Sequence, residues 1–317
     1  MGNTFYFDWE VKLIVWIQSF IGDMGAQIAS AVSILGEEFV LVLMLGFIYW
    51  CYDKEFGKFI GINILVGLVL GPMIKNFAFR RRPYMDHETI ECLKPVKDGA
   101  DIMDVSAQGF SCPSAHATNA AIIYGTFPIY LKNKKFIIPA VVLTFLIGLS
   151  RVMLGVHYPT DVILGWIIGT IIVFAISYFQ KKVKNKAVLY GVILGISLLG
   201  LIYCRTEDYF TGLGLMIGLF SSDFFERRYV NFKNTRHPVE WVLRIIGGFA
   251  TYLSLNAIMK APFSKEFLDT PSAGSFGYRV FRYAVIGFAA YGLYPMLFNK
   301  FGRVFNKNES GESKSDN

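Results

Sequence analysis

Three short groups of polar residues stand at the edges of apolar stretches, and their residue types suit anion binding and acid–base chemistry. Residues 75–83 read K-N-F-A-F-R-R-R-P, residues 113–116 read P-S-A-H, and residues 150–161 read S-R-V-M-L-G-V-H-Y-P-T-D. Charge next to an apolar segment is costly unless it is paired or serves a function. We therefore expect these three motifs to form the working part of the protein.

The first motif supplies cations. Lys75 and Arg82 are seven residues apart, which is two turns of a helix, so both side chains can converge on one anion. Pro83 then ends the helix. The alternative is that cations of this motif snorkel to a membrane surface, and this is the ordinary interpretation of Arg80 and Arg81.

The second motif places a serine and a histidine where a loop meets a helix. Pro113 suits the first turn of a helix, and the free N–H groups and positive dipole end of a helix N-terminus bind anions. Ser114 can add a hydroxyl donor, and His116 can supply a proton. The motif is weak evidence by itself, because a single histidine is more often structural than catalytic.

The third motif pairs an imidazole with a carboxylate. His157 and Asp161 are four residues apart, which is one helical turn. The carboxylate can therefore accept a hydrogen bond from one ring nitrogen and leave the other as a nucleophile or base. Arg151 adds a planar donor that suits a phosphoryl group. A helix-capping role for Asp161 is an open alternative.

Together the three motifs describe a site for a tetrahedral oxyanion. They hold three cations, a helix N-terminus, two histidines and one orienting carboxylate. Two histidines suggest that one attacks phosphorus while the other protonates the leaving oxygen. The sequence contains no P-loop, no acidic metal-binding pattern and no Cys/His metal spacing. We therefore expect phosphoryl chemistry without a metal ion or other cofactor.

The elements that position these motifs are membrane helices. Of the 317 residues, 54% are hydrophobic, 16% are aromatic and only 17% are charged, which lies outside the usual range of soluble domains. The net charge of +7 does not indicate a nucleic-acid partner, because most Lys and Arg lie in short loops where they set membrane orientation. We expect an integral membrane protein surrounded by lipids, whose first segment is not a cleaved signal peptide.

Apolar stretches of roughly 20 residues mark the expected spans. We predict an all-α, polytopic transmembrane bundle of ten helices near residues 9–34, 36–52, 58–79, 113–131, 135–153, 159–180, 187–204, 208–225, 239–260 and 279–300. Asp23 and Gln27 interrupt the first helix, so it could lie in the membrane interface instead. The pair Gly165 and Gly169 indicates close helix packing.

The positive-inside rule orients the bundle. With both termini in the cytoplasm, the lysines of the loops at 132–135 and 181–186 face inward, and the three motifs fall on the extracytoplasmic side. The loop at 80–112 departs from the rule because it opens with three arginines. Cys92 and Cys112 lie in this outer loop, where oxidation is permitted, so we predict a disulfide between them.

The order and spacing of the motifs resemble the signature of the type 2 phosphatidic acid phosphatase (PAP2) superfamily, which includes vanadium haloperoxidases and glucose-6-phosphatase. The pattern is K-x6-R-P, P-S-x-H and S-R-x5-H-x3-D, and the resemblance extends over about residues 39–180. It implies that five residues hold the phosphate: Lys75, Arg82, Ser114, Ala115 and Arg151. The family usually has glycine in place of Ala115, and we expect the methyl group to narrow the pocket without abolishing activity.

The same resemblance implies the catalytic roles. His157 forms a phosphohistidine, Asp161 orients it, and His116 protonates the leaving alcohol and then activates water. We expect hydrolysis of a lipid phosphate or diphosphate monoester at the extracytoplasmic face of the cell membrane. A sugar-phosphate phosphatase, a lipid phosphotransferase and a catalytically silent membrane transporter or receptor are the alternatives.

The resemblance also implies a six-helix core, which about four more helices follow here. We therefore divide the chain into a catalytic membrane core, residues 1–182, additional transmembrane helices of unknown role, residues 183–305, and a disordered cytoplasmic tail, residues 306–317. Nothing in the sequence sets the oligomeric state.

Overall fold

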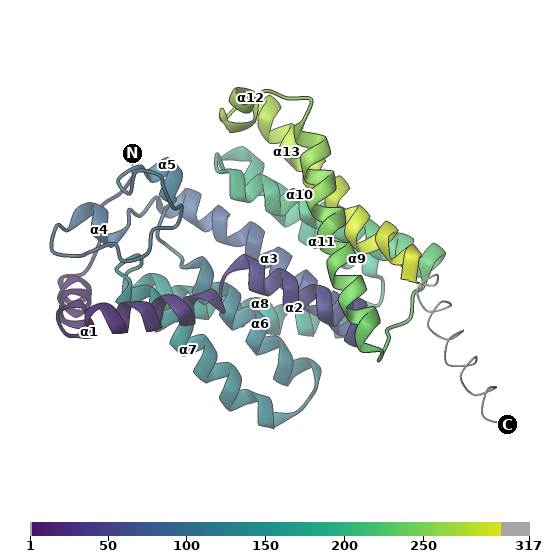
Figure 1. Ribbon diagram of the computed structural model, residues 1–317, viewed down its shortest axis with the longest axis horizontal. Helices are drawn as coiled ribbons and strands as arrows, with labels where there is room; N and C mark the ends of the chain where they lie inside the picture. The colour runs from purple at the N-terminus through teal and green to yellow at the C-terminus, as the bar shows by residue number, and fades with distance from the viewer. Residues whose placement is uncertain (1, 299–317) are drawn as a thin grey trace. The chain divides into compact units, whose positions relative to one another are not determined.

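Helices joined by loops make up the computed structural model, which describes residues 2–298 (Figure 1). The predicted all-α class is confirmed, because no strand is present across these residues and one isolated bridge joins Asn3 to Arg80. The predicted tail, residues 306–317, and the end of the last predicted helix lie outside the described residues.

Within residues 2–298, each of the ten predicted segments corresponds to a helix. The long helices are α1 (Asp8–Ile34), α2 (Glu38–Phe47), α3 (Lys54–Ala78), α6 (Ala115–Tyr130), α7 (Ile137–Met153), α8 (Pro159–Lys182), α9 (Lys186–Leu198), α10 (Glu207–Phe225), α11 (Pro238–Lys260) and α13 (Ala273–Phe288). The short helices are α4 (Pro83–Asp86), α5 (Val105–Gln108) and α12 (Lys265–Asp269). Short π or 3-10 turns extend α2, α9, α10 and α13 at their C-terminal ends.

The protein is a multi-pass membrane protein. Six helical stretches in the described part of the chain are long and apolar enough to cross a membrane: Asp8–Tyr52, Lys54–Ala78, Lys134–Met153, Pro159–Lys182, Pro238–Lys260 and Ala273–Leu297. They include seven of the ten predicted spans, because the first stretch joins two of them. The stretch Lys186–Ile202 is apolar but shorter, and α6 and α10 are not among the six.

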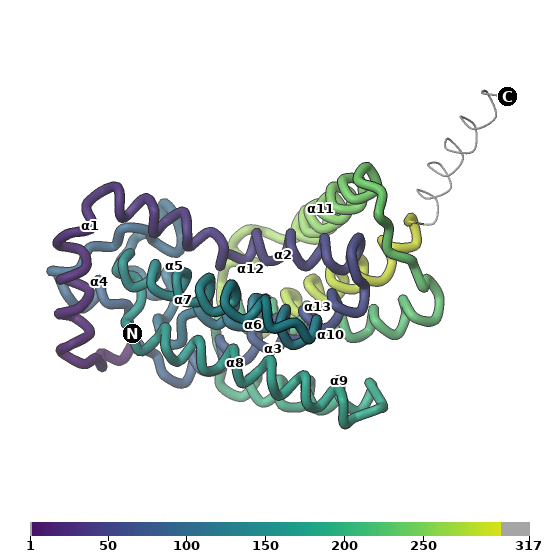
Figure 2. Tube along the Cα trace, turned by 90° about the horizontal axis from the view of Figure 1, so that it is seen from below, coloured from purple at the N-terminus to yellow at the C-terminus, as the bar shows by residue number. Residues whose placement is uncertain are grey.

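The first predicted span is broken. Gly22 has φ 55° and ψ −172° within α1, a backbone conformation that side-chain-bearing residues rarely adopt. Figure 2 shows the α1 trace turning sharply before it runs on toward α2. Each half of α1 is too short to cross a hydrocarbon core of about 30 Å by itself.

The chain forms two compact units, and the three motifs lie in the first. The first unit comprises Met1–Val42 and Ile62–Arg205, and the second comprises Leu43–Gly61 and the chain from Thr206 onward. The first unit therefore extends past residue 182 to include α9. The proposed division at residue 182, which separates a catalytic core from additional helices by role, remains a prediction.

Helix α6 lies against α8 in the first unit, and small residues allow the approach. A methyl group added at Gly165 of α8 would lie 2.9 Å from the carbonyl oxygen of Ser114, and one at Gly169 would lie 2.6 Å from that of Thr118. Neither position has room for a larger residue, so the predicted close packing at this glycine pair is confirmed.

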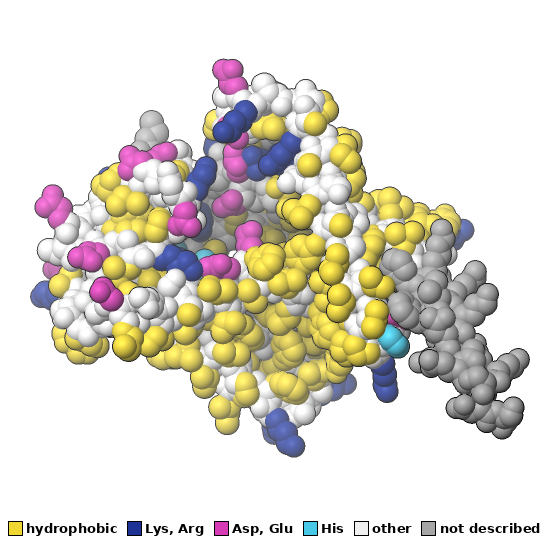
Figure 3. Space-filling view, in the orientation of Figure 1, with side chains coloured by type: hydrophobic (Ala, Val, Ile, Leu, Met, Phe, Trp, Pro, Cys, Tyr) yellow, Lys and Arg dark blue, Asp and Glu magenta, His cyan; other side chains and the backbone are white. Residues whose placement is uncertain are grey.

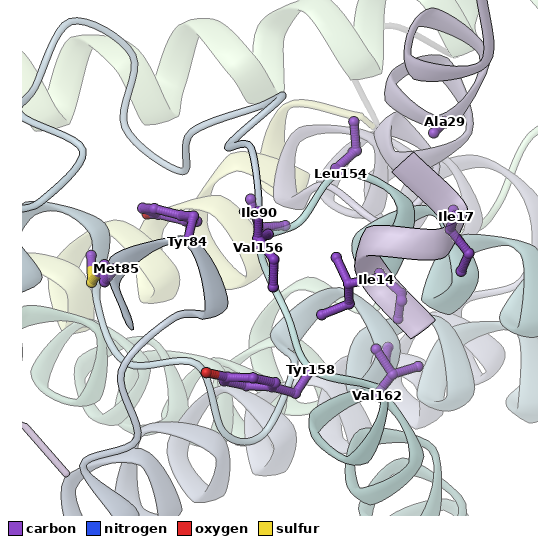
Figure 4. Close-up of a cluster of buried hydrophobic side chains, with 12 residues drawn as sticks. Ile14, Ile17, Ala29, Tyr84, Met85, Ile90, Leu154, Val156, Tyr158 and Val162 are labelled. Atoms are coloured by element: carbon purple, nitrogen blue, oxygen red, sulfur yellow. The ribbon is translucent and has the colours of Figure 1, made fainter. Parts of the chain in front are cut away.

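A buried apolar cluster supports the loop between α7 and α8. Ile14 and Ile17 of α1 lie toward Leu154 of this loop and Val162 of α8 (Figure 4). Tyr158, which is 1% exposed, belongs to the same cluster. Packing on several sides fixes the backbone on which the third motif is built.

Charged and apolar side chains of the first unit are separated on its surface. Figure 3 shows acidic and basic side chains around α4 and α5, a second group of cations at the turn before α7, and apolar side chains over α7 between them. Ile138, Val141 and Phe145 of α7 are exposed, as are Lys134 and Lys135 at its start. An apolar band between charged ends suits a surface embedded in a bilayer.

Candidate active site

The three predicted motifs meet where helices begin and end. Lys75 and Arg151 lie in the last turns of α3 and α7, whereas Ser114 caps the start of α6 and Asp161 lies in the first turn of α8. The Ser114 N–H donates to the Asp161 carbonyl oxygen at 3.0 Å. This hydrogen bond holds the starts of α6 and α8 side by side.

Several side chains at this junction have buried hydrogen-bonding atoms without a partner among residues 2–298, including Nδ1 of His157. Arg151 is 2% exposed, and its Nε and Nη1 have no partner among residues 2–298. Within the same range, Nε2 of His116 also has none. Lys75, Arg151 and His157 lie close enough to His116 to act on it electrostatically. Because burying an uncompensated guanidinium is costly, this cluster suits a bound anion.

Arg82 is buried too, but the protein itself holds its guanidinium. Nε donates to the carbonyl oxygens of Gln108 at 3.0 Å and Gly109 at 3.1 Å, and Nη1 donates to that of Val156 at 2.8 Å. The same Nη1 lies 3.4 Å from Nε2 of His157. Since a guanidinium only donates hydrogen bonds, this contact favours an unprotonated Nε2 and assigns the imidazole proton to Nδ1.

The predicted contact between His157 and Asp161 is present but longer than a hydrogen bond. Nδ1 of His157 lies 3.6 Å from Oδ2 of Asp161. That oxygen accepts hydrogen bonds from Oγ of Ser111 at 2.7 Å and from the backbone N–H of Tyr158 at 2.8 Å. The same carboxylate therefore caps α8, as the alternative interpretation has it, and stands next to the imidazole.

His157 is a neutral imidazole at physiological pH. It lies in the loop between α7 and α8 and is 2% exposed. Burial lowers its pKa to about 3, and the cations Arg82 and Arg151 act in the same direction while Asp161 opposes them. A neutral ring keeps the lone pair of Nε2 available.

Arg80 is not a snorkelling cation, so the interpretation from the sequence is wrong at this residue. It is 2% exposed, and it donates to Asp161 Oδ1 from Nη1 and to Glu10 Oε2 from Nη2, both at 2.7 Å. Arg81 differs, because it is partly exposed and lies 3.3 Å from Asp86. The sequence signal for this contact is Glu10, an acid in an apolar helix that requires a cation.

A second charged pair stands beside the cluster. Nζ of Lys94 donates to Oε1 of Glu37 at 2.6 Å and to Oγ of Ser33 at 3.1 Å. A methyl group added at Gly36 would lie 3.3 Å from Cδ2 of His116. The turn between α1 and α2 therefore covers one side of this imidazole, which the sequence did not indicate because it depends on the path of α1.

The predicted disulfide is absent. All four cysteines fall in the described part of the chain, and all are free. Cys112 is buried next to Asp161, and burial together with this carboxylate raises the pKa of its thiol to about 12. Cys92 lies beside Tyr84 instead. The two thiols have different neighbours, and the prediction that they pair is wrong for this structure.

Comparison with known proteins identifies families and relatives that this chain resembles. The family model of the PAP2 superfamily matches residues 56–185, and that of the PAP2 superfamily phosphatase, transmembrane extension, matches residues 210–307. Phosphatidylglycerophosphatase B of Bacillus subtilis is 39% identical over 107 residues, which are 31% of this chain and 51% of the relative. An undecaprenyl-diphosphatase of the same bacterium is 32% identical over 124 residues, which are 39% of this chain and 58% of the relative.

A third relative decides the family. Decaprenylphosphoryl-5-phosphoribose phosphatase of Mycobacterium tuberculosis is 32% identical over 168 residues, which are 50% of this chain and 84% of the relative. The chain belongs to the PAP2 superfamily. The chain spans only about half the length of the first two relatives it matches.

The two family models cover the three motifs and the last helices, but they do not cover the N-terminal part of α1. The PAP2 match covers all three motifs, and the extension match covers α10 to α13, so these additional helices also occur with other PAP2 superfamily phosphatases. Glu10 precedes the PAP2-matched range. The carboxylate that holds Arg80 from α1 is therefore supplied by a part of the chain that neither family model matches.

Proposed function

We propose that this PAP2 superfamily member is a phosphatase that hydrolyses a lipid phosphate or diphosphate monoester through a phosphohistidine intermediate. The observation that carries the proposal is the buried guanidinium of Arg151, two of whose nitrogens have no partner in the described residues, next to two imidazoles. A dianionic phosphoryl group supplies the missing partner for these nitrogens. Charge-assisted hydrogen bonds of this kind are stronger than hydrogen bonds between neutral groups.

The reaction begins with His157. Its neutral Nε2 attacks the terminal phosphorus, so a P–N bond forms while the P–O bond to the leaving group breaks. The leaving group is a lipid alcohol from a monophosphate and a lipid phosphate from a diphosphate. His116 donates its proton to the leaving oxygen as general acid. In the second half, His116 takes a proton from water, the resulting hydroxide attacks phosphorus, and the P–N bond breaks to give inorganic phosphate and free His157.

The phosphate cradle stabilises the charge that develops in both steps. Lys75, Arg82 and Arg151 supply cations to the phosphate. Lys75 and Arg151 come from the ends of α3 and α7, and Nη1 of Arg82 lies 3.4 Å from the attacking Nε2 of His157. Ser114 and the N–H of Ala115 stand at the start of α6, where the helix dipole favours an anion. Ala115 is exposed, so its methyl group borders the pocket without filling the core.

A lipid substrate fits the setting of the site. The cluster lies at the ends of apolar helices, so an acyl or prenyl tail can stay in the bilayer while its phosphate reaches the cations. Curated relatives are named for glycerolipid and prenyl phosphates or diphosphates. The lysines of the loops at 132–135 and 181–186 support a site on the extracytoplasmic face. The N-terminal residues belong to that same side, because the Asn3 backbone bonds to Phe79 and Arg81 beside the site, so the expectation of a cytoplasmic N-terminus is not retained.

The chemistry belongs to side chains alone in this proposal. No group of three or more His, Cys, Asp or Glu within residues 2–298 is placed to hold a metal ion. The test is phosphate release by purified protein, in EDTA, from phosphatidate, phosphatidylglycerol phosphate, a polyprenyl diphosphate, a sphingoid phosphate and glucose 6-phosphate. We expect release from at least one lipid, loss of release in His157→Ala, and little release from glucose 6-phosphate.

Each alternative has its own outcome in this experiment. Preference for glucose 6-phosphate indicates a sugar-phosphate phosphatase. Transfer of the phosphoryl group to an added lipid alcohol in place of water indicates a phosphotransferase. Absence of release from every substrate by folded protein supports a silent membrane transporter or receptor and contradicts the proposal.

A further inference from the structure

Arg80 joins two buried carboxylates that come from distant parts of the chain. Its Nη2 donates to Oε2 of Glu10 on α1, and its Nη1 donates to Oδ1 of Asp161 on α8, both at 2.7 Å. Nε donates to the carbonyl oxygen of Phe5 at 2.9 Å. Glu10 and Asp161 are both fully buried. All three guanidinium nitrogens are therefore occupied by fixed acceptors.

The surroundings of Arg80 exclude water and select a guanidinium. The ring of Tyr158 lies 4.0 Å from its Cζ, and the ring of Phe5 lies 4.8 Å away. Burial opposes its charge, but Asp161 and Glu10 more than offset this and raise the pKa of Arg80. A lysine at this position has one nitrogen and cannot meet both carboxylates and the Phe5 carbonyl in this geometry.

Glu10 is held as firmly as Asp161. Its Oε1 accepts hydrogen bonds from the N–H of Thr160 at 3.1 Å and from Oγ1 of the same residue at 2.6 Å. Its Oε2 accepts from the N–H of Phe7 at 2.9 Å as well as from Arg80. Thr160 directly precedes Asp161, so the Glu10 carboxylate fixes the first turn of α8 from outside the PAP2-matched range.

We propose that Arg80 and Glu10 are positioning residues that hold the Asp161 carboxylate in place and ionised, so that Asp161 keeps the His157 imidazole turned with Nε2 toward the phosphate. The inference rests on the proposed function and adds the N-terminal part of α1 to the machinery of the site. The chain of contacts runs from Glu10 through Arg80 to Asp161 Oδ1, while Asp161 Oδ2 stands 3.6 Å from Nδ1 of His157.

The rival explanation is that Arg80 only stabilises the fold, as buried ion pairs can. The two explanations differ in what they predict for the site. A positioning residue affects the rate of phosphoryl transfer and leaves the phosphate cradle of Lys75, Ser114 and Arg151 intact. A residue that only stabilises the fold lowers the folded fraction and leaves the rate per folded molecule unchanged.

The test compares Arg80→Lys and Glu10→Gln with the matched control Arg81→Lys, which changes the neighbouring, partly exposed arginine. We expect kcat per folded molecule to fall about 100-fold in Arg80→Lys, the scale of a small misplacement of reacting groups, and less in Glu10→Gln, which keeps the shape of the side chain. The inhibition constant of orthovanadate, a mimic of the bound phosphoryl group, should stay near the wild-type value. Arg81→Lys should match wild type in both measurements.

A double-mutant cycle separates a role through Asp161 from any other role. On the background of Asp161→Asn, adding Arg80→Lys should cost little further activity, because effects of residues that act through one another are not additive. A further 100-fold loss on that background, or an Arg80→Lys variant with wild-type kcat, overturns the inference. An inactive wild-type protein instead overturns the proposed function, so the two failures are distinguishable.

Discussion

Both units bury charged side chains, and two of the buried clusters differ in how their charges are matched. In the second unit, Nζ of Lys58 lies 2.7 Å from Asp223 and 2.6 Å from Glu226, and Lys54 lies 2.9 Å from the other oxygen of Glu226. In the first unit, Arg151 is equally buried, yet two of its nitrogens have no partner in the described part of the chain.

We infer from this difference that the Lys58 cluster stabilises the fold, whereas Arg151 is available to bind an anionic ligand. Removing one partner from a matched, buried cluster leaves an uncompensated charge, so it is strongly destabilising. Removing Arg151, two of whose nitrogens have no partner within residues 2–298, relieves a desolvation cost, so we expect it to reduce activity and not stability. Stability and activity should therefore respond in opposite ways at Lys58 and Arg151.

Lys58→Met tests the matched cluster. Asp223 and Glu226 stay buried without this cation, so we expect the free energy of unfolding to fall by about 3–5 kcal/mol. Thermal unfolding in detergent measures the loss. Phosphate release per folded molecule should not change, and a specific loss of activity without destabilisation would show that this cluster belongs to the active site.

Arg151→Ala tests the unmatched cation. Removal of one donor that stabilises the transition state costs about 10²–10³-fold in rate, so we expect kcat/KM for the best lipid substrate to fall by this factor. The Tm should stay the same or rise. Arg81→Ala, which removes a partly exposed arginine outside the cluster, is the control, and a large drop in Tm for Arg151→Ala contradicts the account.

The buried imidazole gives a pH test. A histidine with the ordinary pKa of about 6.5 would lose about 30-fold of its neutral form on going to pH 5. The pKa of His157 is about 3, so we expect phosphoenzyme formation at pH 5 to retain most of its neutral-pH rate. Rapid-quench measurement at pH 5 and 7 checks this, and a 30-fold loss contradicts the neutral imidazole.

The same low pKa determines whether the free energy of unfolding rises or falls with pH because of His157. Below about pH 6.5 the unfolded chain protonates this histidine, while the folded protein does not until about pH 3. The contribution of His157 to the free energy of unfolding is therefore complete above about pH 6.5 and declines as the pH falls toward 3. Measuring the free energy of unfolding of wild type and of His157→Ala as a function of pH isolates the contribution of His157.

Glu55→Gln has the smallest expected effect. Glu55 lies 2.9 Å from Arg227 and 3.5 Å from Lys58, but its side chain is 50% exposed. An exposed ion pair contributes at most about 1 kcal/mol, so the Tm should change far less than in Lys58→Met. Equal destabilisation by the two substitutions would remove the distinction between buried and exposed charge on which the comparison depends.

Local patterns in the sequence predicted much of the fold and the motifs that converge. Runs of apolar residues predicted where helices form, and the separation of four between His157 and Asp161 predicted their proximity. The first prediction succeeds because the apolar pattern of a helix is local. The second succeeds for another reason, since His157 precedes α8 and the Asp161 carboxylate turns back to cap the start of that helix. The break of α1 at Gly22 was missed because nothing in the residue type alone distinguishes it from a glycine inside a helix.

Contacts between distant segments could not be predicted in the same way. Arg80 meets Glu10 across 70 positions, and only the path of α1 makes it a buried bridge and not a surface cation. The predicted pairing of Cys92 with Cys112 failed for the same reason, because a shared loop says nothing about which side chains meet. Which side chains from distant segments meet depends on the tertiary structure.

The most direct measurement is to trap the intermediate. Wild-type protein is mixed with a labelled lipid phosphate that it hydrolyses, quenched in alkali within milliseconds to preserve acid-labile phosphohistidine, and mapped by mass spectrometry. The account predicts one phosphorylated residue, His157, which is lost in His157→Ala and accumulates in His116→Ala when the leaving group needs no protonation. Phosphate on another residue, or rapid hydrolysis by His157→Ala, would contradict it.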